Sequence, residues 1–283
     1  MEKPKIAWIT DTTSTLDSEY IKKHNIHVIP LNVVINQTSY RETIDITEKE
    51  FYERMSSEEG TFQSSQPSVG EFVELYEKLK AEYDEGIAIH ASSKLTGTYE
   101  TSVMAAEMAG FKLHALDSET GSYPLSFLVK KGISLAEDGA GAEEVIAALK
   151  GILYTTRLYL VPSNLNQLQK SGRVTSGQKV LATLFKINPI LSIENGEAKI
   201  KDKVRTEKRA MNWLIDALGE EKKRFKIAKA AIVHANEPEK AEKLERLVKE
   251  AFPDIDTEIT MLIPAAGVHT GAGTMGLSWV IEK

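Results

Sequence analysis

Three short stretches, far apart in the chain, are rich in small hydroxyl residues and glycine and are the best candidates for chemistry. They span residues 64–68, 92–98 and 268–273. Hydroxyl groups and free backbone N–H groups at helix starts bind anions. The third stretch also holds His269, whose imidazole can donate a hydrogen bond to a carboxylate or a phosphate at neutral pH. Because no other segment has the pattern of a reactive centre, the sequence predicts a protein that holds an anion.

The first two stretches also have structural interpretations. Ser68 is typical of a helix cap, which leaves Ser64 and Ser65 to face a ligand. The second stretch follows an apolar run, and Gly97 opens a predicted helix over residues 98–109. Ligands of open α/β sheets bind beyond the carboxyl ends of the strands, so this position favours binding. The spacing of a P-loop is absent, and the sequence therefore does not support a nucleotide site.

Catalytic and metal-binding arrangements are weakly represented. The chain has no cysteine, which excludes disulfides, thiolate nucleophiles and cysteine-based metal sites. Its six histidines lack the spacing of metal ligands, so we predict no metal and no cofactor. Residues 10–14 are interpreted as a polar turn, with metal or phosphate binding as the alternative. There is no G-x-S-x-G elbow, but Ser93 with His269 could pair as nucleophile and base, so a small-molecule hydrolase or phosphotransferase is the alternative function.

Two basic features face either solvent or a partner. Arg173 follows Gly172 and is either a surface cation at a helix end or an anion-facing group fixed by a glycine turn. A second group of basic residues recurs with a period of two, which places them on one face of a strand. A solvated face is the default interpretation, and a docking patch for an acidic or phosphorylated partner is the alternative. The period-two residues are Lys199, Lys201, Lys203 and Arg205.

The composition is that of a globular protein without a membrane segment. The chain has 283 residues, of which 42% are hydrophobic and 27% are charged. Its net charge of -6 argues against nucleic acid as a partner, because phosphate neutralisation needs an excess of lysine and arginine. The apolar run at residues 6–9 is too short for a signal segment or a membrane span. We therefore expect a cytoplasmic protein with no stable membrane insertion.

Short β-rich runs alternate with segments of helical period, which predicts an α/β fold. In the first half, this alternation predicts a doubly wound, mostly parallel sheet. In the second half, Asn195-Gly196 between two β-rich runs predicts an antiparallel hairpin and hence a mixed α/β lobe. We place the boundary so that the N-terminal lobe covers residues 1–154 and the C-terminal lobe covers residues 155–283, with the ligand between them. The predicted strands are residues 6–10, 27–35, 86–91, 112–116, 155–161, 187–193, 198–204, 227–234, 257–263 and 274–280.

Six motifs, taken in their order and spacing, point to a known family. They are Thr10-Asp11-Thr12-Thr13, Ser65-Gln66-Pro67-Ser68, the run from Ser92 to Tyr99, Leu168-x-x-Ser171-Gly172-Arg173-Val174, Lys203-Val204-Arg205 and Val268-His269-Thr270-Gly271-x-Gly273. With these motifs the chain resembles the DegV family of bacterial fatty-acid-binding proteins, which includes the lipid-carrier subunit of fatty acid kinase. Two departures keep the hydroxyl group, since Ser64 stands where the family has threonine and Thr96 where it has serine. A third does not keep the pattern, because Pro124-Leu125-Ser126 replaces an expected Gly-x-Gly.

The resemblance implies that a long-chain fatty acid lies between two α/β lobes, with its tail in an apolar tunnel. It implies a lipid-binding carrier rather than an enzyme, which presents the carboxylate to a separate fatty acid kinase. The expected carboxylate contacts are Ser64, Ser93 and His269, followed by Ser65, Ser92 and Thr96. Gly97, Gly271 and Gly273 are expected in the supporting loops, and Arg173 and Arg205 are candidates for facing the kinase.

Overall fold

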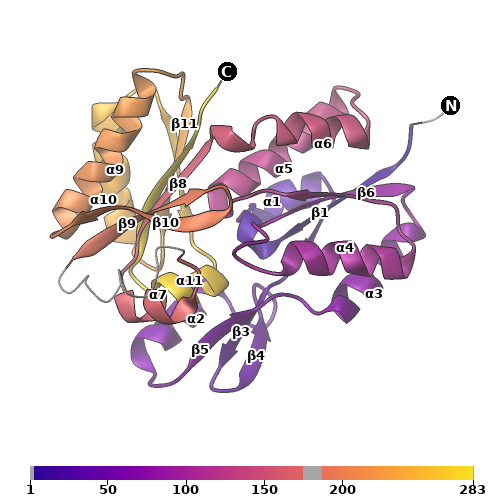
Figure 1. Ribbon diagram of the computed structural model, residues 1–283, viewed down its shortest axis with the longest axis horizontal. Helices are drawn as coiled ribbons and strands as arrows, with labels where there is room; N and C mark the ends of the chain where they lie inside the picture. The colour runs from indigo at the N-terminus through magenta and orange to yellow at the C-terminus, as the bar shows by residue number, and fades with distance from the viewer. Residues whose placement is uncertain (1–2, 175–186, 283) are drawn as a thin grey trace.

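The computed structural model describes residues 3–174 and 187–282. Their strands form three sheets of four, six and three strands. Helices lie against these sheets, and the two larger sheets stand on either side of the molecule with the small sheet below them (Figure 1). The fold is therefore the mixed α/β type that the alternation of strand and helix patterns predicts.

The N-terminal sheet is parallel throughout, with the strand order β2-β1-β6-β7. Alternate residues of β1 face opposite sides: Ile9 packs with α3 and α4, whereas Trp8 packs with α5 and α6. Helices on both faces confirm the predicted doubly wound sheet. The strands are β1 (Ile6–Asp11), β2 (Ile26–Ile29), β6 (Glu85–His90) and β7 (Leu113–Asp117), and the helices are α1 (Ser18–Lys23), α3 (Val69–Lys80), α4 (Thr98–Ala109), α5 (Ser122–Glu137) and α6 (Ala142–Lys150).

A small antiparallel sheet, with the order β4-β3-β5, corrects part of the strand prediction. The predicted strand over residues 27–35 is two strands, because Pro30 lacks a backbone N–H and the chain turns there from β2 into β3. Two further strands were missed, since β4 is mostly exposed and both are only four residues long. The elements are β3 (Asn32–Ile35), β4 (Thr38–Arg41), α2 (Glu48–Ser57) and β5 (Phe62–Ser65).

The C-terminal sheet is mixed and has the order β10-β9-β8-β13-β11-β12. Among its described strands, β11 and β12 are the one neighbouring pair that runs parallel, and Asn195-Gly196 forms the predicted hairpin turn between β9 and β10. A bulge between Ile200 and Asp202 interrupts the hairpin, so the basic residues of β10 do not follow one strict two-residue alternation. The strands are β8 (Thr156–Val161), β9 (Asn188–Glu194), β10 (Glu197–Val204), β11 (Lys229–His234), β12 (Asp256–Met261) and β13 (Met275–Val280), and the helices are α7 (Leu165–Ser171), α9 (Glu207–Lys222), α10 (Pro238–Ala251) and α11 (Pro264–Thr270).

The small sheet and the C-terminal sheet share one hydrophobic core. Val33 of β3 and Phe51 of α2 belong to the same buried cluster as Leu160 of β8 and Val268 of α11. Tyr52 adds a polar link, because its hydroxyl donates to the backbone carbonyl of Leu262 at 2.8 Å. The four-stranded sheet uses strands before residue 154 and the six-stranded sheet uses strands after residue 155, while the small sheet packs across that point. The boundary itself stays a prediction.

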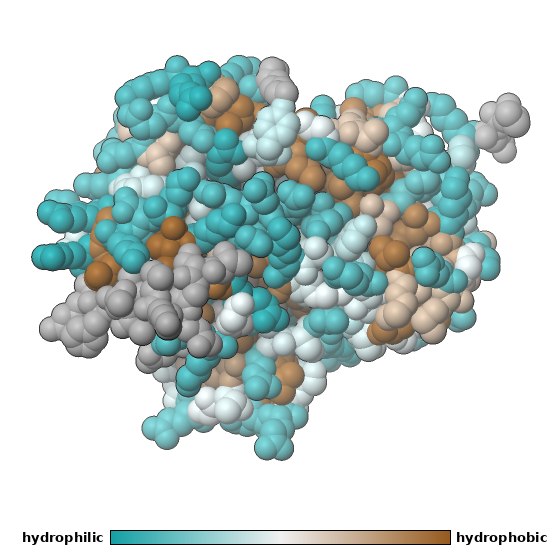
Figure 2. Space-filling view, viewed as in Figure 1, coloured by the Kyte–Doolittle hydropathy of each residue, from teal (hydrophilic) through white to brown (hydrophobic). Residues whose placement is uncertain are grey.

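The surface is largely hydrophilic on the face shown in Figure 2, with apolar patches that include one over α4. That helix carries Met104 and Met108, which are 46% and 66% exposed. None of the helices in the described part of the chain has the length and apolar composition needed to cross a bilayer.

Candidate functional site

A largely apolar cavity lies where the three sheets meet. The N-terminal sheet contributes residues just beyond the carboxyl ends of its strands, such as Thr13 after β1 and Ala91 after β6. The position beyond these strand ends is where ligands bind in open α/β sheets. The other side of the wall is aliphatic and comes mainly from the C-terminal half: Leu158, Leu160, Leu168, Leu191, Ile193 and Ile263.

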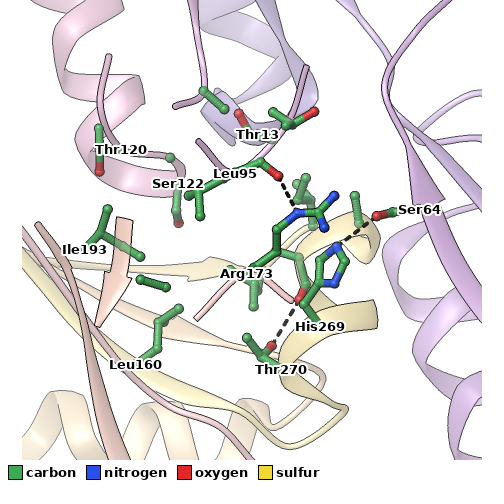
Figure 3. A pocket seen from close by; sticks show the side chains of 18 of the residues that line it. Thr13, Ser64, Leu95, Thr120, Ser122, Leu160, Arg173, Ile193, His269 and Thr270 are labelled. Carbon is green, nitrogen blue, oxygen red and sulfur yellow. Dashed lines mark hydrogen bonds between the residues drawn. The ribbon is translucent and has the colours of Figure 1, made fainter. Parts of the chain in front are cut away.

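The size and lining of the cavity favour an apolar molecule. Its volume is about 160 Å³, roughly ten times the room that one enclosed water needs. Most of the wall consists of aliphatic side chains, which offer no hydrogen bonds to water. Polar side chains also line the cavity, among them Ser64 with His269 at one place, Thr120 with Ser122 at another, and Thr13 elsewhere on the wall (Figure 3).

Ser64 and His269 meet directly at the first of these places. Ser64 lies in β5 and His269 lies in the last turn of α11, 205 residues further along the chain. The Oγ of Ser64 and the Nε2 of His269 are 2.9 Å apart and form a hydrogen bond. Both residues line the cavity, so the structure brings together two of the three leading candidates from the sequence. This short helix was not predicted from the sequence.

Burial keeps the His269 ring neutral. Desolvation, together with the positive charge of Arg173, lowers the pKa of His269 to about 4. A neutral imidazole donates one hydrogen bond and accepts another, so with Ser64 it offers hydrogen bonds without a charge of its own. The charge near this end of the cavity belongs to Arg173, whose Nε donates to the carbonyl of Leu95 at 2.9 Å. Arg173 lines the cavity, in accord with an anion-facing position for it.

The neighbouring candidates Ser65 and Thr96 also line the cavity. The hydroxyls of Thr96 and Thr98 are 2.9 Å apart at the start of α4, which fixes the direction of the Thr96 side chain. Gly97 lies against Gln66, because a Cβ at this position would be 2.7 Å from the amide nitrogen of Gln66. The absence of a side chain at Gly97 therefore lets the β5–α3 connection pack against the start of α4.

Ser92 and Ser93 are not among the described residues that line the cavity. The buried hydroxyl of Ser92 donates to the carbonyl of Gly196 at 2.7 Å and links the two lobes. The backbone N–H of Ser93 donates to the Asp117 carboxylate at 3.3 Å. The Ser92 hydroxyl is thus already bonded within the protein, and its expected role as a carboxylate contact stays a prediction. The described contacts also do not pair Ser93 with His269, so they give the hydrolase alternative no nucleophile–base pair.

The turn after α11 requires glycine. Gly271 has a φ of 94° and Gly273 has a φ of 92°, in a region that side chains disfavour. A Cβ on Gly271 would also lie 2.6 Å from the Cβ of Asn164, in the segment just before α7. These glycines therefore let α7 and α11 approach each other, and α11 carries His269.

Glu42 holds the other end of α11, and the sequence analysis missed it. The side chain is fully buried; its Oε1 accepts from the backbone N–H of Ala265 at 2.6 Å, and its Oε2 accepts from the hydroxyl of Thr12. Burial raises the pKa of Glu42 to about 7. An acidic residue after an exposed strand is typical of a surface group, whereas the groups that cover Glu42 come from Thr12 and from α11, 223 positions away. Glu42 therefore fixes the helix that positions His269.

A serine, a histidine and an aspartate also form a chain of hydrogen bonds away from the cavity. His90 Nδ1 lies 2.9 Å from Asp11 Oδ2, and His90 Nε2 lies 2.9 Å from Ser102 Oγ. Ser102 is fully buried, and its hydroxyl is also bonded to Tyr76, so no substrate reaches it. The arrangement ties β1, β6, α3 and α4 together and is structural. Among the residues that the structure describes, no cluster of side chains could hold a metal ion.

A second, more polar hollow lies on the outer side of the Ser64–His269 pair. Three residues line both the hollow and the cavity: Ser64, Arg173 and His269. Lys170 lines the hollow but is not among the described residues of the cavity. The Ser64–His269 pair therefore stands between the apolar cavity and a polar opening. Arg205, the other candidate for partner contact, is exposed directly after β10 and is not among the described residues of either space.

These features define a class of protein: a mixed α/β fold that encloses an apolar cavity with a small polar end. The chain belongs to the DegV family, whose sequence profile, described as an uncharacterised protein family, matches residues 5–282. It is similar to a DegV domain-containing protein of Halalkalibacterium halodurans, with 36% identity over 99% of both chains. The protein DegV of Bacillus subtilis is 33% identical over 98% of this chain and 99% of its own.

Solved structures of the same fold are described as fatty acid binding proteins. The crystal structure of DegV from Bacillus subtilis, a fatty acid binding protein, has a TM-score of 0.91 and 33% identity, and the match covers 99% of this chain and 100% of that one. A DegV family protein from Thermus thermophilus, described by its fatty acid binding, has a TM-score of 0.90 and 25% identity, with 98% and 100% covered. The likeness extends over the whole described fold and includes the elements that form the cavity.

Proposed function

We propose that this protein binds a long-chain fatty acid, with the acyl tail in the apolar cavity and the carboxylate at Ser64 and His269. The observation that carries the proposal is the pairing of an aliphatic cavity with one part-buried serine–histidine hydrogen bond at its end. The relatives described as fatty acid binding proteins support the same ligand class.

The acyl tail supplies most of the affinity. A palmitate tail has about fourteen methylenes, and each contributes ~0.8 kcal/mol on burial, so the tail gains on the order of 10 kcal/mol before the costs of association. The aliphatic wall, with leucines from β8, β9 and α7, provides the surface for this burial. The tail therefore makes the binding strong without determining which end of the molecule enters first.

The polar end sets the orientation. An unpaired buried carboxylate costs several kcal/mol, so the head group must find hydrogen-bond donors. The bonded pair of Ser64 and neutral His269 has one proton left to donate to a carboxylate, and Arg173 adds a positive charge nearby. Ser93 stays a candidate contact, which the titration of its alanine variant tests.

The test is a titration of delipidated protein with palmitate and with hexadecanol, which has the same tail and no carboxylate. Ser64→Ala and His269→Ala should each weaken palmitate binding about tenfold to a hundredfold, since a hydrogen bond to a charged group is worth about 1.5–3 kcal/mol. Hexadecanol binding should change much less, because it has no charge to stabilise.

Ser57→Ala is a matched control, since Ser57 is an exposed serine whose hydroxyl bonds to the carbonyl of Glu53 in its own helix. It should leave both ligands unaffected. Ser93→Ala, measured in the same way, decides whether Ser93 belongs to the head-group site. If the wild-type protein fails to bind palmitate, or if both variants bind palmitate as the wild type does, the proposal is wrong.

The same geometry supports a carrier that presents the carboxylate to a separate fatty acid kinase. The Ser64–His269 pair also lines the outer polar hollow, so a head group held there is close to the surface. A phosphoryl donor on a partner would approach from this side, where Lys170 and Arg173 provide positive charge. The protein itself then needs no catalytic group and no cofactor, and its role is to hold and orient the acid.

A further inference from the structure

The cavity has a second polar place, at the start of α5. Ser122 is the first residue of this helix and lines the cavity together with Thr120 and Gly121. The side chain is only 5% exposed, and Figure 3 shows its hydroxyl pointing into the cavity, toward the side on which Ile193 and Leu160 lie. Within residues 3–174 and 187–282, the Ser122 hydroxyl has no hydrogen-bond partner.

A buried hydroxyl without a partner is costly, and this one is also held in a strained backbone. Leaving a buried polar group unsatisfied costs free energy, so such groups are rare in folded proteins. Ser122 has a φ of 55°, in the left-handed region that non-glycine residues seldom adopt. Strain of this kind persists where the surrounding structure fixes a side chain for use. The placement of the Ser122 hydroxyl in an apolar cavity therefore costs free energy twice, once for the missing hydrogen bond and once for the left-handed backbone.

The helix start provides more donors around the same point. The N-cap residue of α5, Gly121, makes no side-chain cap, so the first backbone N–H groups of a helix of 16 residues have no cap from it. These groups favour an oxygen atom as their partner. Among the described residues of the cavity wall, Arg173 is the one cation, and it lies with His269 at the other polar place. A second anion at α5 would have no counter-charge, whereas a neutral oxygen needs only hydrogen bonds.

We propose that the start of α5, with Ser122 as its central group, binds an oxygen substituent on the acyl chain, so that the ligands of this protein include hydroxy or oxo long-chain acids. The inference rests on the proposed function, because it places the carboxylate at Ser64 and His269 and the chain in the cavity. Ser122 would then donate to, or accept from, the substituent while the helix start stabilises its oxygen.

The experiment compares stearate with a series of hydroxystearates in which the hydroxyl is moved stepwise along the chain. Each acid is titrated into delipidated wild-type protein and into Ser122→Ala. For the isomer whose hydroxyl reaches Ser122, the variant should lose about threefold to tenfold in affinity relative to stearate, the worth of one neutral hydrogen bond. The oxo analogue of that isomer shows the direction of the bond, because a ketone oxygen can only accept a hydrogen bond. If the oxo acid loses as much affinity as the hydroxy acid in Ser122→Ala, Ser122 donates. If only the hydroxy acid loses affinity, Ser122 accepts.

Two further variants keep the test decisive. Ser122→Gly also removes the hydroxyl but suits the left-handed backbone, so it should lose the same preference even if alanine disturbs folding. Ser126→Ala is the matched control, since Ser126 is buried one turn later in α5 and is not among the described residues of the cavity wall. It should leave every ratio unchanged. If all isomers change by the same factor as stearate in both Ser122 variants, the inference is wrong. If no long-chain acid binds the wild type, the proposed function fails with it.

Discussion

Replacing Glu42 with glutamine should change how the free energy of unfolding depends on pH. Glu42 is fully buried, and burial raises its pKa from 4.5 to about 7 in the folded protein. Below pH 4.5 the carboxyl is protonated in both the folded and the unfolded state, so folding is not opposed. As the pH rises toward 7, the unfolded chain ionises freely while the folded protein must bury a charge, and stability is lost.

The size of this loss follows from the pKa difference. Each tenfold change in proton binding is worth about 1.4 kcal/mol, so the shift of Glu42 from 4.5 to about 7 corresponds to about 3 kcal/mol. Glutamine carries no charge at any of these pH values. Its side-chain oxygen can still accept from Ala265, and its amide can donate to the oxygen of Thr12. Between pH 4.5 and pH 8, the variant should therefore gain about 3 kcal/mol relative to the wild type.

Urea unfolding of both proteins at several pH values in this range measures the difference directly. Glu59→Gln provides the control, since Glu59 is an exposed carboxylate. Its free energy of unfolding, plotted against pH, should run parallel to that of the wild type. If the Glu42→Gln curve is parallel as well, burial does not govern this carboxyl, and the account of Glu42 is refuted.

Two further predictions concern the head-group site and the docking of a kinase. A bound carboxylate stabilises a protonated imidazole, so the pKa of His269 should rise from about 4 when palmitate binds. The NMR signal of its ring measures this change, and the signal of His24 at the end of α1 should not respond to palmitate. An unshifted pKa of His269 would place the carboxylate elsewhere. Arg205→Glu should reduce acyl phosphate formation by a fatty acid kinase at least tenfold, on the order of one lost charge pair at an interface, and change palmitate affinity less than twofold; normal turnover would remove Arg205 from the docking surface.

The sequence predicts most of the two large sheets because their signals are local. Apolar runs of strand length alternate with helix-period segments, and these patterns depend on nearby residues alone. The Asn195-Gly196 turn is a further local signal, since both residues tolerate a positive φ, and it forms as predicted between β9 and β10. The small sheet was only partly predicted, because the four residues of β4 are mostly exposed and its hydrogen bonds come from β3.

The candidate site shows the same division between local and distant causes. The residue types at Ser64 and His269 suggested an anion site, and the fold places them 2.9 Å apart. The partner of Ser92 lies 104 residues away, so nothing beside it in the sequence indicates that its hydroxyl is already bonded. Glu42 presents the same difficulty, because the groups that bury it come from α11 and from Thr12. The short helix α11 was missed as well, since seven residues are too few to show helical periodicity.

The core shared by the small sheet and the C-terminal sheet has a consequence for how the molecule comes apart. Val33 and Phe51 are completely buried, yet part of what covers them is supplied by residues after position 155. Separating the two parts of the chain would leave those side chains facing water, so the small sheet and the C-terminal sheet would both lose packing. The two lobes should therefore melt in a single cooperative transition, and a protease cut in the connecting segment should cost the whole protein its stability rather than release two intact pieces.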